Sequence, residues 1–283
     1  MSNQQQYQYI VTLALKEDIG RGDVTTEAIY SGREYAEAEL IAKEEGVVAG
    51  LELAGYIYNQ MDGNIEFHAE KRDGERIKRG QLLGVAKGQA NILLSAERTV
   101  LNFMQRMSGI ATMTRAFSDA ISHTKTRILD TRKTIPGHRY LDKWAVRLGG
   151  GTNHRMRLDD LFLIKENHIS VAGSVPHAID RCLAYKRTHN LDTKIEIEVT
   201  DLEMLKKVLK HGGADIVMLD NMGLDHLKEA VDLAESRVKL EASGNMKLEN
   251  VADVAETGVD YISVGAITHS ARALDISMLF AEL

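Results

Sequence analysis

The feature that most constrains the fold is a series of short apolar runs in the second half of the chain, each ending in a polar or charged residue. Helical stretches, such as residues 201–211 and 247–256, separate most of these runs. Strands that alternate with helices of this length are typical of a parallel sheet with right-handed crossovers. The runs are residues 128–129, 161–164, 195–199, 216–219, 238–242 and 261–264. Six strands of one kind predict a closed or nearly closed α/β barrel.

The chain before about residue 115 has a different pattern. Residues 36–42 alternate as a strand does, and residues 95–109 carry apolar side chains at helical spacings of three and four. Closely spaced glycines among valines and leucines in residues 46–50 and 74–88 predict hairpins. Residues 73–80 faintly resemble a lipoyl- or biotin-carrier turn, but Lys43 does not lie in the tight turn that a carrier lysine needs. We therefore interpret these turns as structural.

Composition and charge exclude several classes of protein. The chain has 283 residues, 44% hydrophobic and 27% charged, with two prolines and a net charge of −6. These values fit a folded globular protein and do not fit a uniformly basic nucleic-acid binder. The single cysteine, Cys182, excludes an intrachain disulfide, and nothing around it marks a nucleophile. No signal peptide and no apolar stretch of membrane-spanning length is evident, so we expect a cytoplasmic protein that contacts no membrane.

The polar residues that end the apolar runs carry the functional argument. In barrels of this kind the reactive groups lie at the carboxyl ends of the strands. Surface capping would explain one or two charged residues there, but not six. Glu196 and Glu198 also lie two residues apart, which places both on one face of a strand.

A cationic cluster indicates an anionic small ligand. Between Lys125 and His168 there are ten Lys or Arg residues against five Asp or Glu residues, in a chain that is acidic overall. Arginine suits two-pronged recognition of carboxylate or phosphate, and lysine suits a point contact. The alternatives are a solvated basic face or a nucleic-acid patch, and no aromatic residues interleave to support the latter.

Glu198 and Asp220 form an acidic pair because they end consecutive strands. Carboxylates beside a cationic pocket could hold Mg²⁺ on a pyrophosphate or stabilise positive charge on a sugar. The acid and nucleophile of a glycosidase are the competing use, which leaves the arginines unexplained. His154 and His168 have no partner ligands at metal spacing, so we interpret them as hydrogen-bonding histidines.

The last two runs end in loops that could bind phosphate. Residues 241–245 (EASGN) and 263–266 (SVGA) close these runs, and we expect a helix after each. Barrels commonly bind phosphate at these loops through free backbone N–H groups. The sequence has no Walker A pattern, no dinucleotide-binding glycine fingerprint and no His-Glu-x-x-His zinc motif.

Several longer motifs resemble the quinolinate phosphoribosyltransferase family nearly from end to end. They are KEDIG (16–20), ERT (97–99), DTRKT (130–134), GGGTNHR (149–155), IKENH (164–168), LDN (219–221), EASG (241–244) and TGVDYISVGAITHS (257–270). Small departures from the family pattern occur at Ile135, His138 and Asn245-Met246. These departures put the fine fit of the substrate in question and leave the matched charged positions intact.

The resemblance implies a two-domain α/β fold. It implies an N-terminal α/β sandwich in residues 1–114, joined by residues 269–283, and a catalytic α/β barrel of the type II phosphoribosyltransferase kind in residues 115–268. It also implies a homodimer, or a higher oligomer, in which Arg98 reaches into the neighbouring subunit's site.

The resemblance further implies the reaction and its residues. Quinolinate and phosphoribosyl pyrophosphate would give nicotinate mononucleotide, pyrophosphate and CO₂ in NAD biosynthesis, with Mg²⁺ as cofactor at Glu198 and Asp220. The implied catalytic residues are Lys133, Lys165, Glu198 and Asp220. The implied substrate-binding residues are Arg98, Thr131, Arg132, Lys133, His154, Arg155, Lys165, Glu198, Asp220, Ser243, Gly244, Asn245, Val264 and Gly265. Among them, Arg132, His154, Arg155 and Lys165 would bind the dicarboxylate, Lys133 would meet the donor, and Ser243, Gly244 and Gly265 would hold phosphate.

Two alternatives stay open at this point. One is a related phosphoribosyltransferase that acts on nicotinate or another small base. The other is a non-catalytic barrel that binds phosphorylated ligands and regulates a partner. The intact charged positions and the number of arginines favour a catalyst that acts on a dicarboxylate.

Overall fold

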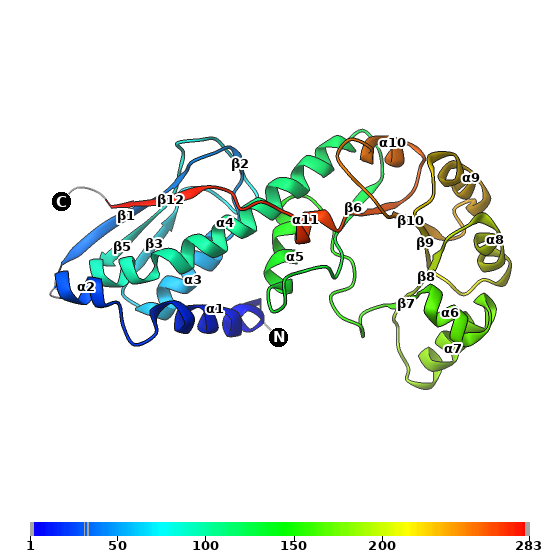
Figure 1. The fold of residues 1–283 in the computed structure, drawn as a ribbon, viewed down its shortest axis with the longest axis horizontal. Helices are drawn as coiled ribbons and strands as arrows, with labels where there is room; N and C mark the ends of the chain where they lie inside the picture. The colour runs from blue at the N-terminus through cyan, green and yellow to red at the C-terminus, as the bar shows by residue number, and fades with distance from the viewer. Residues whose placement is uncertain (1–2, 31, 33, 281–283) are drawn as a thin grey trace. The chain divides into compact units, whose positions relative to one another are not determined.

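The computed structural model describes residues 3–30, 32 and 34–280, and the chain divides into two units (Figure 1). Unit 1 comprises the described residues up to Arg115, together with Thr134–Gly150 and the described residues from Thr268 onward. Unit 2 comprises Ala116–Lys133 and Gly151–Ile267. Within the described residues no helix is both long enough and apolar enough to span a membrane.

Unit 1 is built on a four-stranded antiparallel sheet in the order β12-β1-β5-β3. Its strands are β1 (Tyr35–Ala42), β3 (Glu66–Ala69), β5 (Leu82–Gln89) and β12 (Ile276–Phe280). Alternate residues of β1, namely Ala38, Leu40 and Ala42, are fully buried, so this strand presents one apolar face to the core. Figure 1 shows α3 (Leu51–Met61) and α4 (Ala90–Ala120) lying along one face of the sheet.

The remaining helices of unit 1 are α1 (Asn3–Ile19), α2 (Val24–Ile29) and α5 (Arg139–Leu148). Three of its helices meet around Tyr7, whose ring lies 5.0 Å from Tyr56 and 5.9 Å from Trp144. The sequence predicted α4 only over residues 95–109, but the helix continues through Gly109. A Cβ at Gly109 would lie 2.0 Å from the carbonyl oxygen of Arg272, so glycine is needed there for the close approach of the two backbones.

The predicted hairpins at the glycine-rich segments are wrong. β2 (Gly46–Val47) pairs with β4 (Arg76–Ile77), which lies far along the chain, and residues 82–89 form the long central strand β5. Gly84 and Gly88 lie inside β5, where an added Cβ would meet Phe67 at 2.9 Å and Ile65 at 2.2 Å. These glycines make room for side chains that pack over the sheet, so they do not mark turns.

Unit 2 contains a six-stranded parallel sheet in the order β6-β11-β10-β9-β8-β7. Its strands are β6 (Arg127–Leu129), β7 (Phe162–Ile164), β8 (Ile195–Val199), β9 (Ile216–Asp220), β10 (Lys239–Ser243) and β11 (Tyr261–Ser263). All six predicted runs are strands, and all pairings are parallel. The predicted two-domain α/β class is therefore confirmed.

The helices that follow β7 are α6 (Glu166–Ala172), α7 (Val175–Thr188), α8 (Leu202–His211), α9 (Leu224–Ala234), α10 (Val251–Glu256) and α11 (Ala266–His269), the last of which crosses the boundary of unit 2 at Ile267. Figure 1 shows α6, α7, α8 and α9 on one side of strands β7 to β10. The helix predicted over residues 247–256 begins only at Val251. A turn comes first, in which the side-chain oxygen of Asn250 accepts the backbone N–H of Lys247 at 2.8 Å.

Among the described residues the strand pairings do not close the sheet into a ring, because β6 and β7 lie at its two ends. A single parallel bridge, between Leu129 and Thr152, adds one further residue beside β6. Between Thr152 and β7, the Arg155 side chain donates from Nη1 to the carbonyl of Leu161 at 3.1 Å. The loop between Thr152 and β7 thus carries residues of the predicted site.

Residues Thr134–Gly150 pack with unit 1, whereas the expected division at residue 115 assigned them to the barrel. The reason is α5, whose apolar residues Leu141, Ala145 and Val146 are buried in unit 1. Lys143, which the sequence placed in the cationic cluster, is also fully buried there.

Candidate active site

The carboxyl ends of the unit 2 strands surround a polar cavity of about 390 Å³, called here the rim cavity. Its lining includes nine of the predicted site residues: Thr131, Arg132, Lys133, His154, Arg155, Lys165, Glu198, Asp220 and Ser243. Leu163, Met218 and Ser263 complete the lining. The ends of strands β6 to β11 thus bring together polar and charged residues that are up to 132 positions apart in the sequence, from Thr131 to Ser263.

Four cations line the rim cavity: Arg132, Lys133, Arg155 and Lys165. Burial, and then the nearby guanidinium of Arg132, lower the pKa of Arg155, while Glu196 acts in the opposite direction. Two guanidinium groups that repel each other in a partly buried site favour binding of an anion, which would relieve the repulsion. The other cations of the predicted cluster lie elsewhere; Lys125, Arg127 and Arg157, for example, are exposed and do not line the cavity.

The two predicted carboxylates have different partners. Lys165 Nζ donates to Glu198 Oε2 at 2.8 Å, and the Glu198 side chain is only 15% exposed. Asp220 Oδ2 accepts the side-chain amide of Asn221 at 2.8 Å. Each carboxylate also has a second oxygen, and carboxylate oxygens are the ligands that Mg²⁺ prefers in proteins. The pair therefore fits the predicted metal role by its chemistry.

The segment that carries His154 and Arg155 is fixed by a buried aspartate. Asp130, which is fully buried, accepts the backbone N–H of His154 at 2.9 Å and the side-chain amide of Asn153 at 2.5 Å. The ring Nδ1 of His154 in turn accepts the backbone N–H of Arg155 at 2.7 Å. This chain of bonds holds the Arg155 backbone against the end of β6.

A buried cluster lies behind His154. His154 Nε2 is 3.0 Å from Glu196 Oε2 and 3.6 Å from Glu241 Oε2, and both carboxyl groups are fully buried. Ser263 Oγ donates to Glu241 Oε1 at 2.5 Å. Burial, and then the charge of Glu196, raise the pKa of Glu241 to about 8. At neutral pH the Glu241 carboxyl group is therefore mainly protonated.

The predicted phosphate loops follow β10 and β11. Gly244 and Asn245 both have left-handed backbones, with φ of +97° and +52°. Asn245 donates from its side chain to Asn221 Oδ1 at 3.1 Å. Val264 is buried, and its N–H donates to the carbonyl of Leu129 at 2.9 Å, while Gly265 directly precedes α11. None of Gly244, Asn245, Val264 and Gly265 is among the residues that line the rim cavity.

Arg98 lies on α4 in unit 1, with a side chain that is 59% exposed. Its guanidinium Nη2 is 3.4 Å from Oε1 of the adjacent Glu97. The side chain is thus on the surface of its unit, where a second subunit could meet it.

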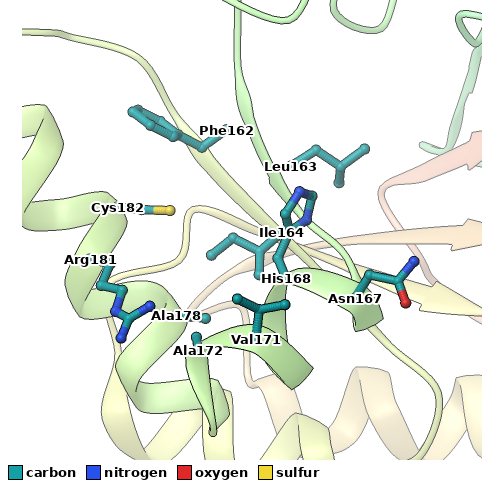
Figure 2. A pocket seen from close by; sticks show the side chains of 10 residues that line it. All are labelled: Phe162, Leu163, Ile164, Asn167, His168, Val171, Ala172, Ala178, Arg181 and Cys182. Atoms are coloured by element: carbon teal, nitrogen blue, oxygen red, sulfur yellow. The ribbon is translucent and has the colours of Figure 1, made fainter.

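A second, larger cavity of about 540 Å³ is apolar in character (Figure 2). Figure 2 shows side chains of β7, α6 and α7 around it, among them Phe162, Val171 and Cys182. Burial raises the pKa of the Cys182 thiol, which is consistent with the unreactive cysteine that the sequence predicted. The convergent charged groups line the rim cavity, which is therefore the candidate active site.

Three polar residues of the site were missed by the sequence-based list: Glu196, Glu241 and Ser263. Glu196 and Glu241 lie inside their strands, whereas Ser263 is the last residue of β11. Strand alternation could have found two of them, because Glu196 lies two residues before Glu198 and Glu241 two residues before Ser243.

The chain matches two family models over most of its length. The model of the quinolinate phosphoribosyl transferase C-terminal domain matches residues 110–279, and that of the N-terminal domain matches residues 23–108. Quinolinate phosphoribosyltransferase [decarboxylating] 1b of Nicotiana tabacum is 45% identical over 284 residues, which cover 95% of this chain and 81% of the tobacco protein. The probable nicotinate-nucleotide pyrophosphorylase [carboxylating] of Bacillus subtilis is 42% identical over 93% of this chain and 89% of its own.

Solved structures agree with the sequence matches. The crystal structure of NadC from Streptococcus pyogenes superposes with a TM-score of 0.93 at 37% identity, over 99% of this chain and 98% of that chain. The nicotinate-nucleotide pyrophosphorylase from Francisella tularensis also gives a TM-score of 0.93, at 40% identity and with the same coverage. The similarity therefore extends over both units.

Proposed function

The chain belongs to the quinolinate phosphoribosyl transferase family, and we propose that it transfers a phosphoribosyl group from phosphoribosyl pyrophosphate to quinolinate with decarboxylation. The products are nicotinate mononucleotide, pyrophosphate and CO₂, which makes the protein a pentosyltransferase of NAD biosynthesis. The observation that carries this proposal is the rim cavity, where four cations and two carboxylates meet at the ends of parallel strands.

The cations bind the acceptor. Quinolinate carries two carboxylates, and the cavity is lined by two guanidinium groups and one ammonium group, those of Arg132, Arg155 and Lys165. Guanidinium groups bind carboxylates in a planar, two-pronged manner, which orients the pyridine ring. His154 lines the same cavity beside Arg155. The pyridine nitrogen has a lone pair outside the ring π-system, so the chain needs no general base to activate it.

The carboxylates serve the donor. As the anomeric C–O bond breaks, positive charge develops on the ribose, and the carboxylates of Glu198 and Asp220 stabilise it. The same two residues would hold Mg²⁺, directly or through the donor's oxygens, and the ion would offset the charge of the departing pyrophosphate. Lys133, with Thr131 beside it, binds the donor's phosphates. Backbone N–H groups of the loops at Ser243–Asn245 and Val264–Gly265 hold the 5′-phosphate.

Positioning accounts for most of the catalysis. The bond from the pyridine nitrogen to the ribose forms as the bond to pyrophosphate breaks, which leaves a cationic ring. When CO₂ departs, the electron pair of the broken bond stays on C2, where the adjacent cationic nitrogen stabilises it, and a proton then binds to C2 and completes the product. The residues need only hold the two reactants in line and exclude competing orientations.

The assembly and the location complete the proposal. The protein acts as a homodimer or a higher oligomer in which Arg98 of each subunit completes the neighbour's acceptor site; its exposed position on unit 1 supports this. The protein is cytoplasmic, although names of its relatives include chloroplastic and mitochondrial forms. Analytical ultracentrifugation tests the assembly, and cell fractionation tests the location.

One assay tests the proposed reaction. Release of CO₂ from carboxyl-labelled quinolinate should require phosphoribosyl pyrophosphate and should stop when Mg²⁺ is chelated. Nicotinate, which lacks the second carboxylate, serves as the comparison substrate. Turnover of nicotinate but not of quinolinate would show a phosphoribosyltransferase for a different acceptor, and no turnover of either would favour a non-catalytic barrel.

A further inference from the structure

Two cavities of unit 2 share a wall. His154 and Arg155 line both the rim cavity and a second cavity of about 150 Å³ inside the barrel, called here the inner cavity. Glu196 and Glu241 line only the inner cavity and are fully buried. Two buried acids are costly to a fold unless their charge is shared or neutralised, and the proposed reaction uses neither of them.

The hydrogen bonds of His154 fix the position of its ring proton. Nδ1 accepts the backbone N–H of Arg155 at 2.7 Å, so Nδ1 carries no proton. The proton of the neutral ring is therefore on Nε2, which lies 3.0 Å from Glu196 Oε2 and 3.6 Å from Glu241 Oε2. Nε2 thus lies within 4 Å of an oxygen atom of each of two buried carboxyl groups.

This arrangement does not suit a metal ion. His154, Glu196 and Glu241 offer ligand atoms within 4.8 Å of one another, which would be close enough for one ion. A metal on Nε2 would need the lone pair of that nitrogen and would move the ring proton to Nδ1. The backbone N–H of Arg155 already points at Nδ1, so two donors would face each other there. The cluster is therefore built to hold protons.

The two acids have different roles in the cluster. Glu196 Oε2 lies 3.0 Å from Nε2 of His154, within ion-pair distance of the ring. Glu241 Oε1 accepts the hydroxyl of Ser263 at 2.5 Å, while Oε2 faces the ring and the other acid. Burial and the neighbouring Glu196 raise the pKa of Glu241, so Glu241 binds a proton more readily than an ordinary glutamate does. The chain of contacts then runs from Ser263 through Glu241 and Glu196 to His154.

We propose that Glu196 and Glu241 are positioning residues, which hold the His154 ring as the Nε2–H tautomer and thereby fix the Arg155 guanidinium for the acceptor's carboxylates. The inference rests on the proposed function, since it assumes that Arg155 binds the acceptor. Asp130 holds the backbone N–H of His154 independently, so the two acids control the ring rather than the fold of the segment. A ring that turned would release the Arg155 N–H and shift the guanidinium.

Three substitutions separate the roles of the two acids. Glu196→Gln replaces the carboxyl group beside Nε2 with an amide that can turn an N–H toward the ring, so the Michaelis constant for quinolinate should rise about tenfold, with a smaller change in kcat. Glu241→Ala should have a similar effect. Glu241→Gln should recover most of that loss, because glutamine can accept from Ser263 and donate to Glu196 as a protonated acid does. Glu203→Gln, on the exposed face of α8, is the matched control and should match the wild type.

The ring itself provides a readout that a purely structural role would not change. The ¹⁵N NMR signals of His154, assigned with His154→Asn, should show a protonated Nε2 and an unprotonated Nδ1 in the wild type at pH 7 without substrate. This pattern should persist in Glu241→Gln and be lost in Glu196→Gln. A wild-type ring protonated on Nδ1 would overturn the proposal. An unchanged Michaelis constant for quinolinate in Glu196→Gln would also overturn it. The same holds if the Michaelis constant for the donor rises as much as that for quinolinate.

The design keeps failures of the two proposals apart. If wild-type protein does not turn over quinolinate, the proposed function fails, whereas the wild-type ring signals still decide the tautomer. If Glu196→Gln does not fold, Ser263→Ala takes its place, because it removes only the hydroxyl at the end of the chain of contacts. A rise of about threefold in the Michaelis constant for quinolinate would then support the proposal, and an unchanged Michaelis constant would overturn it.

Discussion

Lys165 and Glu198 face each other in the rim cavity, with Lys165 Nζ 2.8 Å from Glu198 Oε2. The ammonium group that should bind the acceptor is thus already paired with a carboxylate that should serve the donor. An acceptor carboxylate must compete with Glu198 for Lys165, and when it succeeds it frees Glu198. Binding of the acceptor thereby prepares the group that acts on the donor.

Replacing this carboxylate should have opposite effects on binding and turnover. In Glu198→Gln the ammonium group of Lys165 loses its competitor, so quinolinate should bind about twofold to fivefold more tightly. Turnover should fall by about a hundredfold, because a charge that stabilises the ribose is lost. Calorimetry with quinolinate alone and an assay of pyrophosphate release measure the two effects. Weaker binding of quinolinate would contradict the competition; Asp159→Asn, in an exposed pair with Arg157, is the control.

Arg155 should discriminate between the two substrates. Arg155→Ala should weaken quinolinate binding by about 2–5 kcal/mol, because a partly buried charged partner is lost. Donor binding should change less. Arg155→Lys should recover only part of the loss, since lysine lacks the planar fork that binds a carboxylate in two places. Titration with each substrate separates the effects, and equal losses of both affinities would argue against a dedicated acceptor role.

Gly244 should be required for the donor. Its φ is +97°, and an added Cβ would lie 2.2 Å from Asn221 Oδ1, so Gly244→Ala forces the loop after β10 to move. The Michaelis constant of the donor should rise by about tenfold or more, with little change in the affinity for quinolinate. Gly63→Ala, where an added Cβ meets nothing within 4 Å, provides the comparison. A selective loss of quinolinate affinity would place the loop at the other substrate.

Arg98 should act across a subunit boundary. Mixing inactive Arg98→Ala subunits with inactive Lys165→Ala subunits should restore activity, because one site in each mixed dimer carries both lesions and the other carries none. Random assortment gives about a quarter of the wild-type activity in a symmetric dimer. If verified exchange of subunits brings no recovery, each chain builds its own site.

Asp142 and Arg106 should stabilise unit 1. Arg106 donates two hydrogen bonds, at 2.9 and 2.8 Å, to the Asp142 carboxylate, whose side chain is 1% exposed. Arg106→Ala leaves that buried charge uncompensated and should cost about 3–5 kcal/mol of unfolding free energy. Urea denaturation measures this loss, and Arg157→Ala, in an exposed pair, should remain close to the wild type.

The same variant should respond to pH. Burial raises the pKa of Asp142, although Arg106 partly opposes this effect. A raised pKa means that the folded state binds the proton more tightly than the unfolded state. The stability that protonated Asp142 contributes is therefore present at low pH. It is lost as the pH rises through the pKa that Asp142 has in the folded state. Without Arg106 the pKa of Asp142 should rise further. The loss of unfolding free energy in Arg106→Ala should therefore be smaller at pH 5 than at pH 7. An equal loss at both pH values would exclude Asp142 as its source.

The sequence predicted the barrel well because its strands are apolar runs that end where the chemistry lies. Residues 195–199 and 216–219 were found as strands, and the charged residues Glu198 and Asp220 then followed from the rule that strand ends carry function. Local pattern and global fold agree in this part of the chain. Conversely, Glu241 and Ser263 were noted only as parts of the expected phosphate loops, and the sequence did not show that Glu241 lies buried beside His154.

Unit 1 was harder to predict because its pairings are distant in sequence. Glycines in β5 were interpreted as turns, whereas they accommodate Phe67 and Ile65, and no local pattern reveals what packs over a strand. The segment Thr134–Gly150 interrupts the barrel and returns to unit 1, although its α5 looks like any helix between two strands. Such returns depend on tertiary contacts, which short-range periodicity does not encode.

The pairing of β12 with β1 has a consequence for how the protein folds during synthesis. Ala42 pairs with Ile276, so the first strand of the unit 1 sheet receives its outer neighbour only after more than two hundred further residues have been made. Contacts this distant along the chain slow folding. Until they form, β1 presents an open edge to which a strand of another nascent chain could add. The ribosome therefore completes unit 2 before unit 1 can be finished, and chaperones would find their substrate at that edge.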